Sequence, residues 1–340
     1  MPEVQQARRT LAIWLFSVCA LLALMVVVGG LTRLTGSGLS ITEWKPIHGA
    51  LPPLSLEDWN QEFDAYKRIP QYQLLNNGMT LEEFKDIFWW EWSHRNLGRL
   101  IGFSFLIPFL FFWWRGMVEP ALVPRLLALF ALGGMQGALG WFMVASGLSV
   151  RTEVSQYRLV AHLALALVIY AAIFVTALPL WRREWPALKS PHPLHRLSKA
   201  IVALVFVQIL LGGFVAGLDA GLTYNTWPLM DDALLPAGLY PTWLAPFEDV
   251  TTVQFDHRMM AYIVFAGIVA LFIQGLRKGL NSTATLTAWL LLGAVTLQVL
   301  LGIWTLLAVV PIGLAACHQL GAVALLTAAL LYSDSLRRNA

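Results

Sequence analysis

The feature that most constrains the fold of this chain is a series of eight long apolar segments. Each is about 20 residues long, which is the length that an α-helix needs to cross the hydrocarbon core of a bilayer. Charged residues make up only 13% of the 340 residues, whereas soluble globular proteins carry about 25%. The sequence therefore predicts an all-α polytopic membrane protein with transmembrane helices at 11–31, 95–114, 122–146, 158–181, 198–218, 257–275, 285–308 and 313–332.

The distribution of charge along the chain predicts its orientation in the membrane. The 219–256 segment contains no Lys or Arg, whereas basic residues cluster beside the helix ends on the other side. The positive-inside rule places both termini in the cytoplasm, with the 32–93 and 219–256 segments on the outer side. Amphipathic stretches at 55–69 and 80–90 are expected to form short helices that lie over the membrane.

The two halves of the chain look like copies of each other. The matching segments are 29–53 with 212–236, 91–95 with 254–258, 135–142 with 297–304 and 160–163 with 316–319. Because each half holds an even number of predicted spans, both copies have the same orientation in the membrane. We therefore expect two pseudo-symmetric four-helix bundles, formed by residues 1–183 and 184–340.

The repeat places four histidines at matching positions, namely His94, His162, His257 and His318. Each lies at or near the start of a predicted span. An intramembrane imidazole is costly without a partner and indicates a functional site by default. Two helices of a bundle can each present one imidazole to its interior, which is how bundles hold cofactors. The sequence predicts that His94 with His162, and His257 with His318, are axial ligands of two heme irons.

Other polar side chains accompany these histidines. Arg95 and Arg258 each follow a histidine directly, and such an arginine can bind a heme propionate or anchor its helix at the membrane interface. Gln136, Gln208 and Gln298 recur in the pattern Q-x-x-L-G or a near variant. We expect these glutamines to form interhelical hydrogen bonds, because amide side chains often link helices inside membranes.

The other histidines and the two cysteines are expected to play no part in a site. His48, His192 and His195 lie in predicted loops without repeat partners and are expected at the solvated surface. Cys19 and Cys317 lie in apolar surroundings and are expected to be small buried side chains.

The two halves differ at one position beside a histidine. Glu91 stands three residues before His94, whereas Gln254 stands three residues before His257. A carboxyl in an apolar site can have a raised pKa and can pass protons. This difference predicts chemistry at the first heme and a structural or electron-relay function for the second. The alternative is that Glu91 is a helix N-terminal carboxylate, stabilised by the macrodipole.

Taken together, these motifs resemble those of the heme A synthase family. The residues that carry the resemblance are EWSHR at 91–95, the three further histidines and GGLTRLTGSGLSITEWKPIHGALPP at 29–53. The resemblance extends over nearly the whole chain and is closest to members from mitochondria and alphaproteobacteria. It implies a protein of the bacterial inner membrane that oxidises the C8 methyl group of heme O to a formyl group by successive hydroxylations, giving heme A for cytochrome c oxidase.

The resemblance also implies functions for individual residues. His94 and His162 would hold the substrate heme, His257 and His318 would hold a resident heme b, and Glu91 would be needed for catalysis. Heme O and membrane lipid are the expected partners, and the net charge of +3 gives no support for nucleic-acid binding. The electron-transfer partner, docking on heme O synthase and assembly into homo-oligomers are left open.

Two alternatives use some of the same features. A membrane cytochrome b that only transfers electrons would need the four histidines but not the difference between Glu91 and Gln254. A transporter would also contain repeated helices, but its substrate site would lie near the midplane of the membrane in broken helices. Here the polar residues gather near one face of the predicted bundles, which argues against transport.

Overall fold

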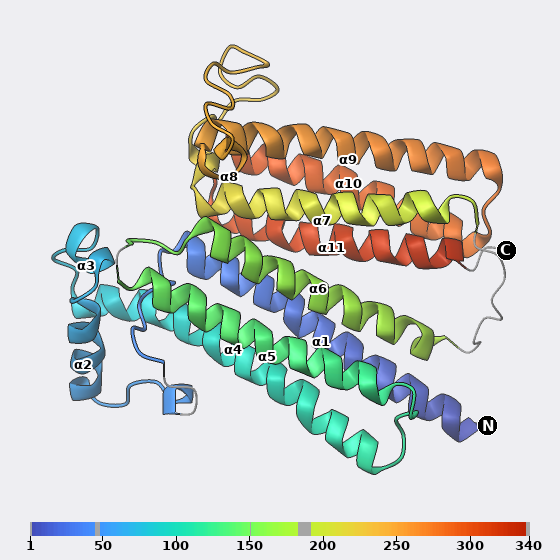
Figure 1. Ribbon diagram of the computed structural model, residues 1–340, viewed down its shortest axis with the longest axis horizontal. Coiled ribbons are helices and arrows are strands. Elements are labelled where there is room, and N and C mark those ends of the chain that lie inside the picture. The colour runs from blue at the N-terminus through green and yellow to red at the C-terminus, as the bar shows by residue number, and fades with distance from the viewer. Residues whose placement is uncertain (1, 45–47, 150, 183–191, 338–340) are drawn as a thin grey trace. The chain divides into compact units, whose positions relative to one another are not determined.

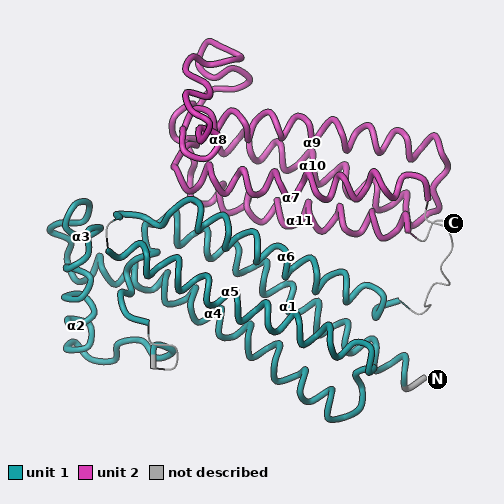
Figure 2. Tube along the Cα trace, in the orientation of Figure 1, with its two compact units in different colours: residues 1–183 teal, residues 184–340 magenta. Residues whose placement is uncertain are grey.

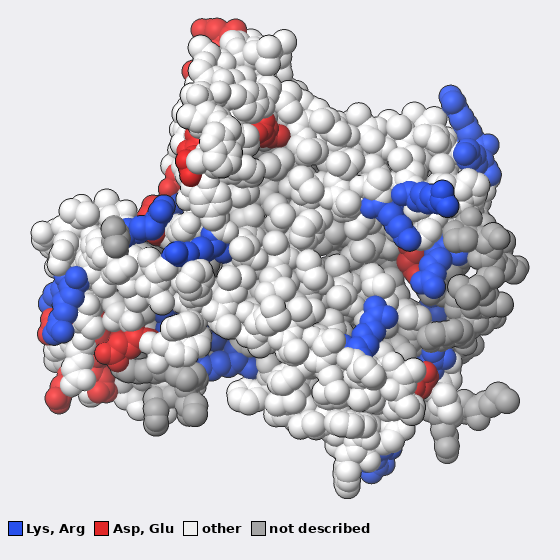
Figure 3. Space-filling model, in the orientation of Figure 1, with Lys and Arg blue, Asp and Glu red and all other residues white. Residues whose placement is uncertain are grey.

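The computed structural model describes residues 2–44, 48–149, 151–182 and 192–337. Within them, eight helices are long and apolar enough to cross a membrane, and no strand is present (Figure 1). The prediction of an all-α polytopic membrane protein is therefore confirmed. On the visible face, charged side chains lie mainly near the helix ends, and the long stretch between them is largely free of charge (Figure 3).

The chain divides into two compact units, Met1–Arg183 and Glu184–Ala340 (Figure 2). The junction between them, and the basic residues Arg183, Lys189 and Arg338 that contributed to the predicted orientation, lie outside the described residues.

In the first unit, four long helices form a ring. They are α1 (Pro2–Leu34), α4 (Leu81–Trp114), α5 (Val123–Gly147) and α6 (Gln156–Trp181). Both α1 and α5 pack against α4 and α6. The helices α4 and α6 therefore occupy opposite corners of the ring, so that side chains on their inner faces point toward each other.

The second unit has the same order of helices and the same neighbours. Its long helices are α7 (His195–Gly217), α9 (Val250–Lys278), α10 (Ser282–Leu307) and α11 (Ile312–Arg337). Both α7 and α10 pack against α9 and α11. The diagonal helices α9 and α11 are thus the counterparts of α4 and α6.

The helix α4 begins much earlier than the predicted start at residue 95. Thr80 is its N-cap, and its side chain forms a capping box with Glu83. The amphipathic stretch at 80–90 is therefore the first part of α4, which corrects the expectation of a separate surface helix. Because α4 starts at Leu81, Glu91 and His94 lie well beyond its first turn, where the macrodipole has little effect.

The outer segment of the first unit folds onto this extension of α4. It contains the short helices η1 (His48–Ala50), α2 (Leu56–Tyr66) and α3 (Pro70–Leu74). Phe63 and Tyr66 pack on Phe84 and Phe88 of α4, and the ring centroids of Phe63 and Phe84 are 5.0 Å apart. Aromatic rings dominate the energetics of such contacts because each buries a large area. This small apolar core fastens the outer segment to α4 close to Glu91.

The outer segment of the second unit is less regular. It contains η2 (Ala220–Leu222) and α8 (Ala245–Glu248), and Asp249 caps the following helix α9 through Thr252. The hydroxyl of Tyr240 donates a hydrogen bond of 2.6 Å to Asp256 of α9. Polar contacts therefore fasten this segment to its helix.

Two expectations about single residues are wrong. His195 is the first residue of α7, is 8% exposed, and its Nδ1 lies 3.0 Å from the carbonyl oxygen of Ser333. It is buried because α7 begins before the predicted start at residue 198. Cys19 is buried as expected, whereas Cys317 is exposed on α11.

Candidate functional site

The four histidines that the sequence predicts to be heme ligands lie on the diagonal helices of the two units. His94 is on α4 and His162 on α6, while His257 is on α9 and His318 on α11. In each unit the two histidines lie on the two diagonal helices, which share both of their neighbouring helices. All four side chains are half-buried, so each keeps some accessible surface within a bundle of apolar helices.

A glycine of a neighbouring helix lies against each imidazole. A methyl group added at any of these glycines would meet the ring at a distance that forces something to shift or give way. The pairs are Gly29 with His94, Gly140 with His162, Gly212 with His257 and Gly302 with His318, at 3.3, 3.0, 3.1 and 2.9 Å from the nearest ring atom. The absence of a Cβ therefore lets each ring lie close to the neighbouring helix.

Three of the histidines also contact a glutamine from that same neighbouring helix. The Nε2 atoms of Gln136, Gln208 and Gln298 each donate a hydrogen bond of 3.0 Å to the backbone carbonyl of their histidine. Each Nε2 also lies 3.1 or 3.2 Å from a ring nitrogen. These contacts join α5 to α6, α7 to α9 and α10 to α11, which confirms the predicted interhelical hydrogen bonds.

The free oxygen of each glutamine fits the needs of a metal-bound imidazole. The Oε1 atoms of Gln136, Gln208 and Gln298 are buried and have no partner among the described residues. An imidazole that binds a metal through one nitrogen usually donates its other N–H to an acceptor. Rotation of the glutamine side-chain amide, which exchanges Oε1 and Nε2, would present Oε1 to the ring as that acceptor.

The donor set in each unit fits a heme rather than a bare metal ion. In the described part of the chain, no group of three or more His, Cys, Asp or Glu could hold a metal ion. A heme iron already has four porphyrin nitrogens and takes only axial ligands from the protein. Two imidazoles from opposite helices, each lying against a glycine, are suited to hold such a group between them.

Glu91 lies at the centre of a polar cluster that joins α4 to the segment after α1. Its Oε1 is ion-paired with Nη2 of Arg95 at 2.5 Å, and its Oε2 accepts hydrogen bonds from Ser40 Oγ and the Ile41 N–H, both at 2.8 Å. Glu91 is only 2% exposed. The surroundings of Glu91 are therefore polar rather than apolar, because a cation and two further donors contact its carboxylate.

The two arginines hold backbone carbonyls of the outer segments. Arg95 donates to the carbonyl of Ile41 at 2.8 Å, and Arg258 donates to the carbonyl of Tyr224 at 2.7 Å. Ile41 and Tyr224 are matching positions in the repeat. Both arginines therefore fasten the same point of an outer segment to the helix that carries a histidine.

The second unit forms this junction without an ion pair. Gln254, the counterpart of Glu91, donates through Nε2 to the carbonyl of Tyr224 at 3.1 Å, and this oxygen also accepts the bond from Arg258. The Oε1 of Gln254 is buried without a partner among the described residues. A neutral amide is thus sufficient to hold the outer segment in place.

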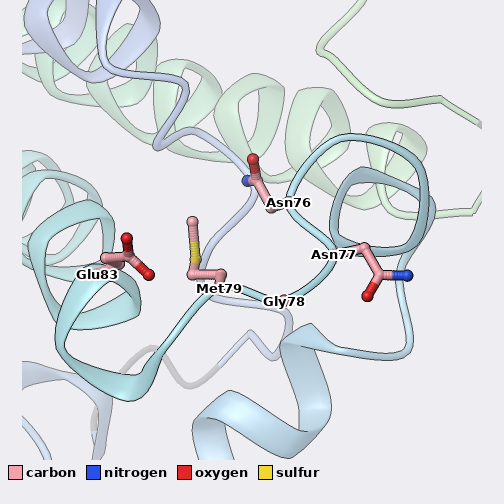
Figure 4. A pocket seen from close by; sticks show the side chains of 5 residues that line it. All are labelled: Asn76, Asn77, Gly78, Met79 and Glu83. Atoms are coloured by element: carbon pink, nitrogen blue, oxygen red, sulfur yellow. The ribbon is translucent and has the colours of Figure 1, made fainter.

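A separate open depression of about 430 Å³ lies at the start of α4 (Figure 4). It is lined by Asn76, Asn77, Gly78, Met79 and Glu83. Glu83 is already engaged in the capping box with Thr80, and the lining contains no histidine. We therefore do not assign a function to this depression.

Some contacts of the site were not predicted from the sequence. Ser40 and Ile41 were not identified as partners of Glu91, because they belong to a loop whose path one sequence does not define. The contacts between the glycines and the imidazoles were not predicted either. A signal was present, since Gly29 matches Gly212, and Gly140 matches Gly302, in the internal repeat.

Comparisons with known proteins identify the family. The model of the COX15-CtaA family, described as cytochrome oxidase assembly protein, matches residues 12–330. Heme A synthase of Parvibaculum lavamentivorans is 54% identical over 332 residues, which cover 95% of each chain. Heme A synthase of Azorhizobium caulinodans is 52% identical over 344 residues, covering 99% of this chain and 97% of the relative. Because these matches span nearly the whole sequence, the chain belongs to the COX15-CtaA family of cytochrome oxidase assembly proteins.

Proposed function

We propose that this chain is a heme A synthase, which oxidises the C8 methyl group of heme O to a formyl group. The observation that carries this proposal is the identity above 50% to heme A synthases over nearly the full length of both chains. Written with water as the oxygen donor, the methyl group gives first the alcohol and then the aldehyde, and each of the two stages releases two protons and passes two electrons to a membrane electron acceptor. The product, heme A, is the heme that cytochrome c oxidase requires.

The first unit, residues 1–183, is the proposed site of heme O. His94 and His162 would hold its iron, since they lie on the diagonal helices of one bundle. The residue three positions before His94 is the carboxylate Glu91, which pairs with Arg95, whereas the matching position in the second unit is the neutral Gln254. This placement supports oxidation in the first unit.

The second unit, residues 184–340, is the proposed site of a resident heme b. His257 and His318 would be its axial ligands, and Gln208 and Gln298 hold these two side chains in place. When bound, heme b supplies a one-electron redox group. Arg258 keeps an Nε without a partner among the described residues, which leaves a donor for a propionate.

Glu91 is the proposed proton-handling group. It shares a face of α4 with His94, because residues three apart on a helix are neighbours. Arg95 is ion-paired with Oε1 of the carboxylate, and the Ser40 hydroxyl donates to Oε2. We propose that Oε2 accepts a proton during oxidation of the methyl group, while Arg95 keeps the carboxylate aligned. Arg95 also orders the loop at Ile41, next to the heme site.

Both heme sites are proposed to face the periplasmic side of a bacterial inner membrane, with both termini in the cytoplasm. Two observations support this orientation. The 219–256 segment lacks basic residues, as expected for an outer segment. All four histidines also lie in the first half of helices that follow the proposed outer side.

The test is conversion of heme O by the purified protein. We expect protein in detergent, supplied with heme O and a membrane fraction as the source of its redox partner, to form heme A that chromatography and mass spectrometry identify. A protein with His94→Ala should form none. Binding of heme b without any conversion of heme O would contradict the proposal and favour a cytochrome b that only transfers electrons.

A further inference from the structure

The four histidines differ in one contacting residue of the neighbouring helix, the residue four positions before the glycine that lies against the imidazole. In three cases a glutamine stands one helical turn before the glycine on which the imidazole lies. These glutamine and glycine pairs are Gln136 with Gly140, Gln208 with Gly212 and Gln298 with Gly302. On α1, the residue one turn before Gly29 is Met25. His94 is therefore the one ligand of the four without a glutamine at this position.

Met25 points toward α4 near His94. Its Cε lies 3.5 Å from the place that a Cβ of Gly98 would occupy, and Gly98 is one turn after His94 on α4. A thioether donates no hydrogen bond and is only a weak acceptor. Among the contacts of the described residues there is no hydrogen bond to the His94 ring, whereas each of the other three rings has an amide within hydrogen-bond distance.

A hydrogen-bond partner changes how an imidazole holds a metal. It defines the tautomer and the orientation of the ring and raises its basicity, and its loss typically lowers metal affinity by about 10- to 100-fold. An imidazole that is positioned by packing alone turns more freely and leaves the iron more readily. By this reasoning, His94 is the weakest of the four ligands, and His162 on the opposite side is supported by Gln136.

We propose that Met25 makes His94 the releasable axial ligand of the substrate site. The inference rests on the proposed function, because a synthase must take up heme O and release heme A in every turnover. Gln136, Gln208 and Gln298 are positioning residues that hold the other three imidazoles. In the second unit a glutamine contacts each of the two ligand histidines, as expected for a site whose heme remains bound.

Reciprocal substitutions test this proposal. Met25→Gln gives the first unit the amide of the second, and Gln208→Met gives the second unit the thioether of the first. Met25→Leu is the matched control, because it keeps an apolar side chain of similar volume. The proteins are loaded with heme O and heme b, and the transfer of each heme to apomyoglobin is followed by chromatography, which separates the two pigments.

We expect Met25→Gln to slow the release of heme O by about 10- to 100-fold and Gln208→Met to speed the release of heme b by a similar factor. Met25→Leu, whose side chain also offers no hydrogen bond to the His94 ring, should not slow the release of heme O as Met25→Gln does. The electron paramagnetic resonance signal of the ferric first site should also shift in Met25→Gln, because the orientation of the His94 ring becomes defined. A role in packing alone would move neither the spectrum nor the order of the release rates.

Equal rates of heme O release from the wild type, Met25→Gln and Met25→Leu would overturn the proposal. If Met25→Gln does not fold, a Gln208→Met protein that retains heme b as firmly as the wild type would overturn it independently. Failure of the proposed function is distinguishable, since the wild type would then bind heme O without converting it, or would not bind it at all.

Discussion

The two units fasten their outer segments at the same point but with different charge. In the first unit an ion pair between Glu91 and Arg95 does so, and in the second unit neutral Gln254 stands beside Arg258. The second unit shows that the junction needs no carboxylate. A buried ion pair is seldom the most stable solution, because removing two charges from water is costly. The charge of Glu91 therefore requires a reason other than stability, and proton transfer is such a reason.

A second difference between the units lies at the same histidine. His94 has Met25 where His257 has Gln208. These two differences both lie beside His94 of the first unit, whereas the glycine contacts are the same in both units. This pattern is what duplication followed by specialisation of one copy for turnover would produce.

Removal of a proposed axial ligand should have the largest effect on heme binding and should show most clearly which heme each unit binds. We expect His318→Ala to abolish binding of heme b in the second unit, and His162→Ala to abolish binding of heme O in the first. Heme content by pyridine hemochrome spectra measures both. His192→Ala, outside both sites, is the control and should bind both pigments. If His318→Ala kept its heme b spectrum unchanged, the assignment of ligands in the second unit would be wrong.

Neutralising Glu91 makes the first unit resemble the second. We expect Glu91→Gln to lower heme O turnover by about 10²- to 10⁴-fold, which is the usual contribution of a positioned acid or base. Heme O binding and thermal stability should change little, because Gln254 already performs the structural task in the second unit. Chromatographic assay of heme A measures the loss.

The control for this substitution is Glu83→Gln on the same helix. Glu83 belongs to the capping box of α4 and lies outside the polar cluster, so this variant should keep its turnover. Near-normal formation of heme A by Glu91→Gln would remove Glu91 from the mechanism and would leave the difference between the units without a chemical reason.

Removing the arginines tests whether the two junctions differ in energy. Arg95→Ala leaves the Glu91 carboxylate buried without its cation, which costs about 3–5 kcal/mol. Arg258→Ala removes hydrogen bonds to carbonyl oxygens, which costs about 1–3 kcal/mol. Thermal unfolding in detergent and proteolysis within residues 38–44 measure the difference.

A double variant, Glu91→Gln with Arg95→Ala, should be more stable than Arg95→Ala, because the uncompensated charge is gone. Equal destabilisation by Arg95→Ala and Arg258→Ala, together with no recovery in the double variant, would mean that the ion pair contributes nothing beyond its hydrogen bonds.

Much of the fold could be predicted because hydropathy reports segments that fit the membrane. The same property explains the error at α4, where the helix continues into the polar stretch from Leu81 that hydropathy does not detect. The placement of the four histidines in two pairs on membrane helices could be predicted, because an intramembrane imidazole is rare and the internal repeat shows the same placement in both halves. The partners of Glu91 could not, because contact with Ser40 depends on how a distant loop folds.

The glycines beside the imidazoles should give a graded effect. An added methyl group would lie 2.9 Å from the His318 ring in Gly302→Ala, but 3.3 Å from the His94 ring in Gly29→Ala. We expect the first substitution to displace its ring and shift the spectrum of heme b, and the second to cause a smaller shift at the heme O site. Electron paramagnetic resonance of the ferric protein checks this order. A larger shift for Gly29→Ala would contradict the contact distances.

The substitution Tyr240→Phe in the outer segment of the second unit should have the smallest effect, a pH-dependent change in thermal stability. The hydrogen bond from the Tyr240 hydroxyl to Asp256 raises the pKa of Tyr240 from 10.0 to about 12, with burial adding to the shift. The folded protein therefore holds this proton more tightly than the unfolded chain does. The stabilisation is complete below pH 10 and is lost as the pH rises from about 10 to about 12.

Because Tyr240 is 50% exposed, solvent screening limits the cost of Tyr240→Phe to less than about 1 kcal/mol. Thermal unfolding of the two proteins should differ slightly at pH 8 and converge near pH 12, and a difference that grew with pH would mean that Asp256 does not hold the phenol in its neutral form.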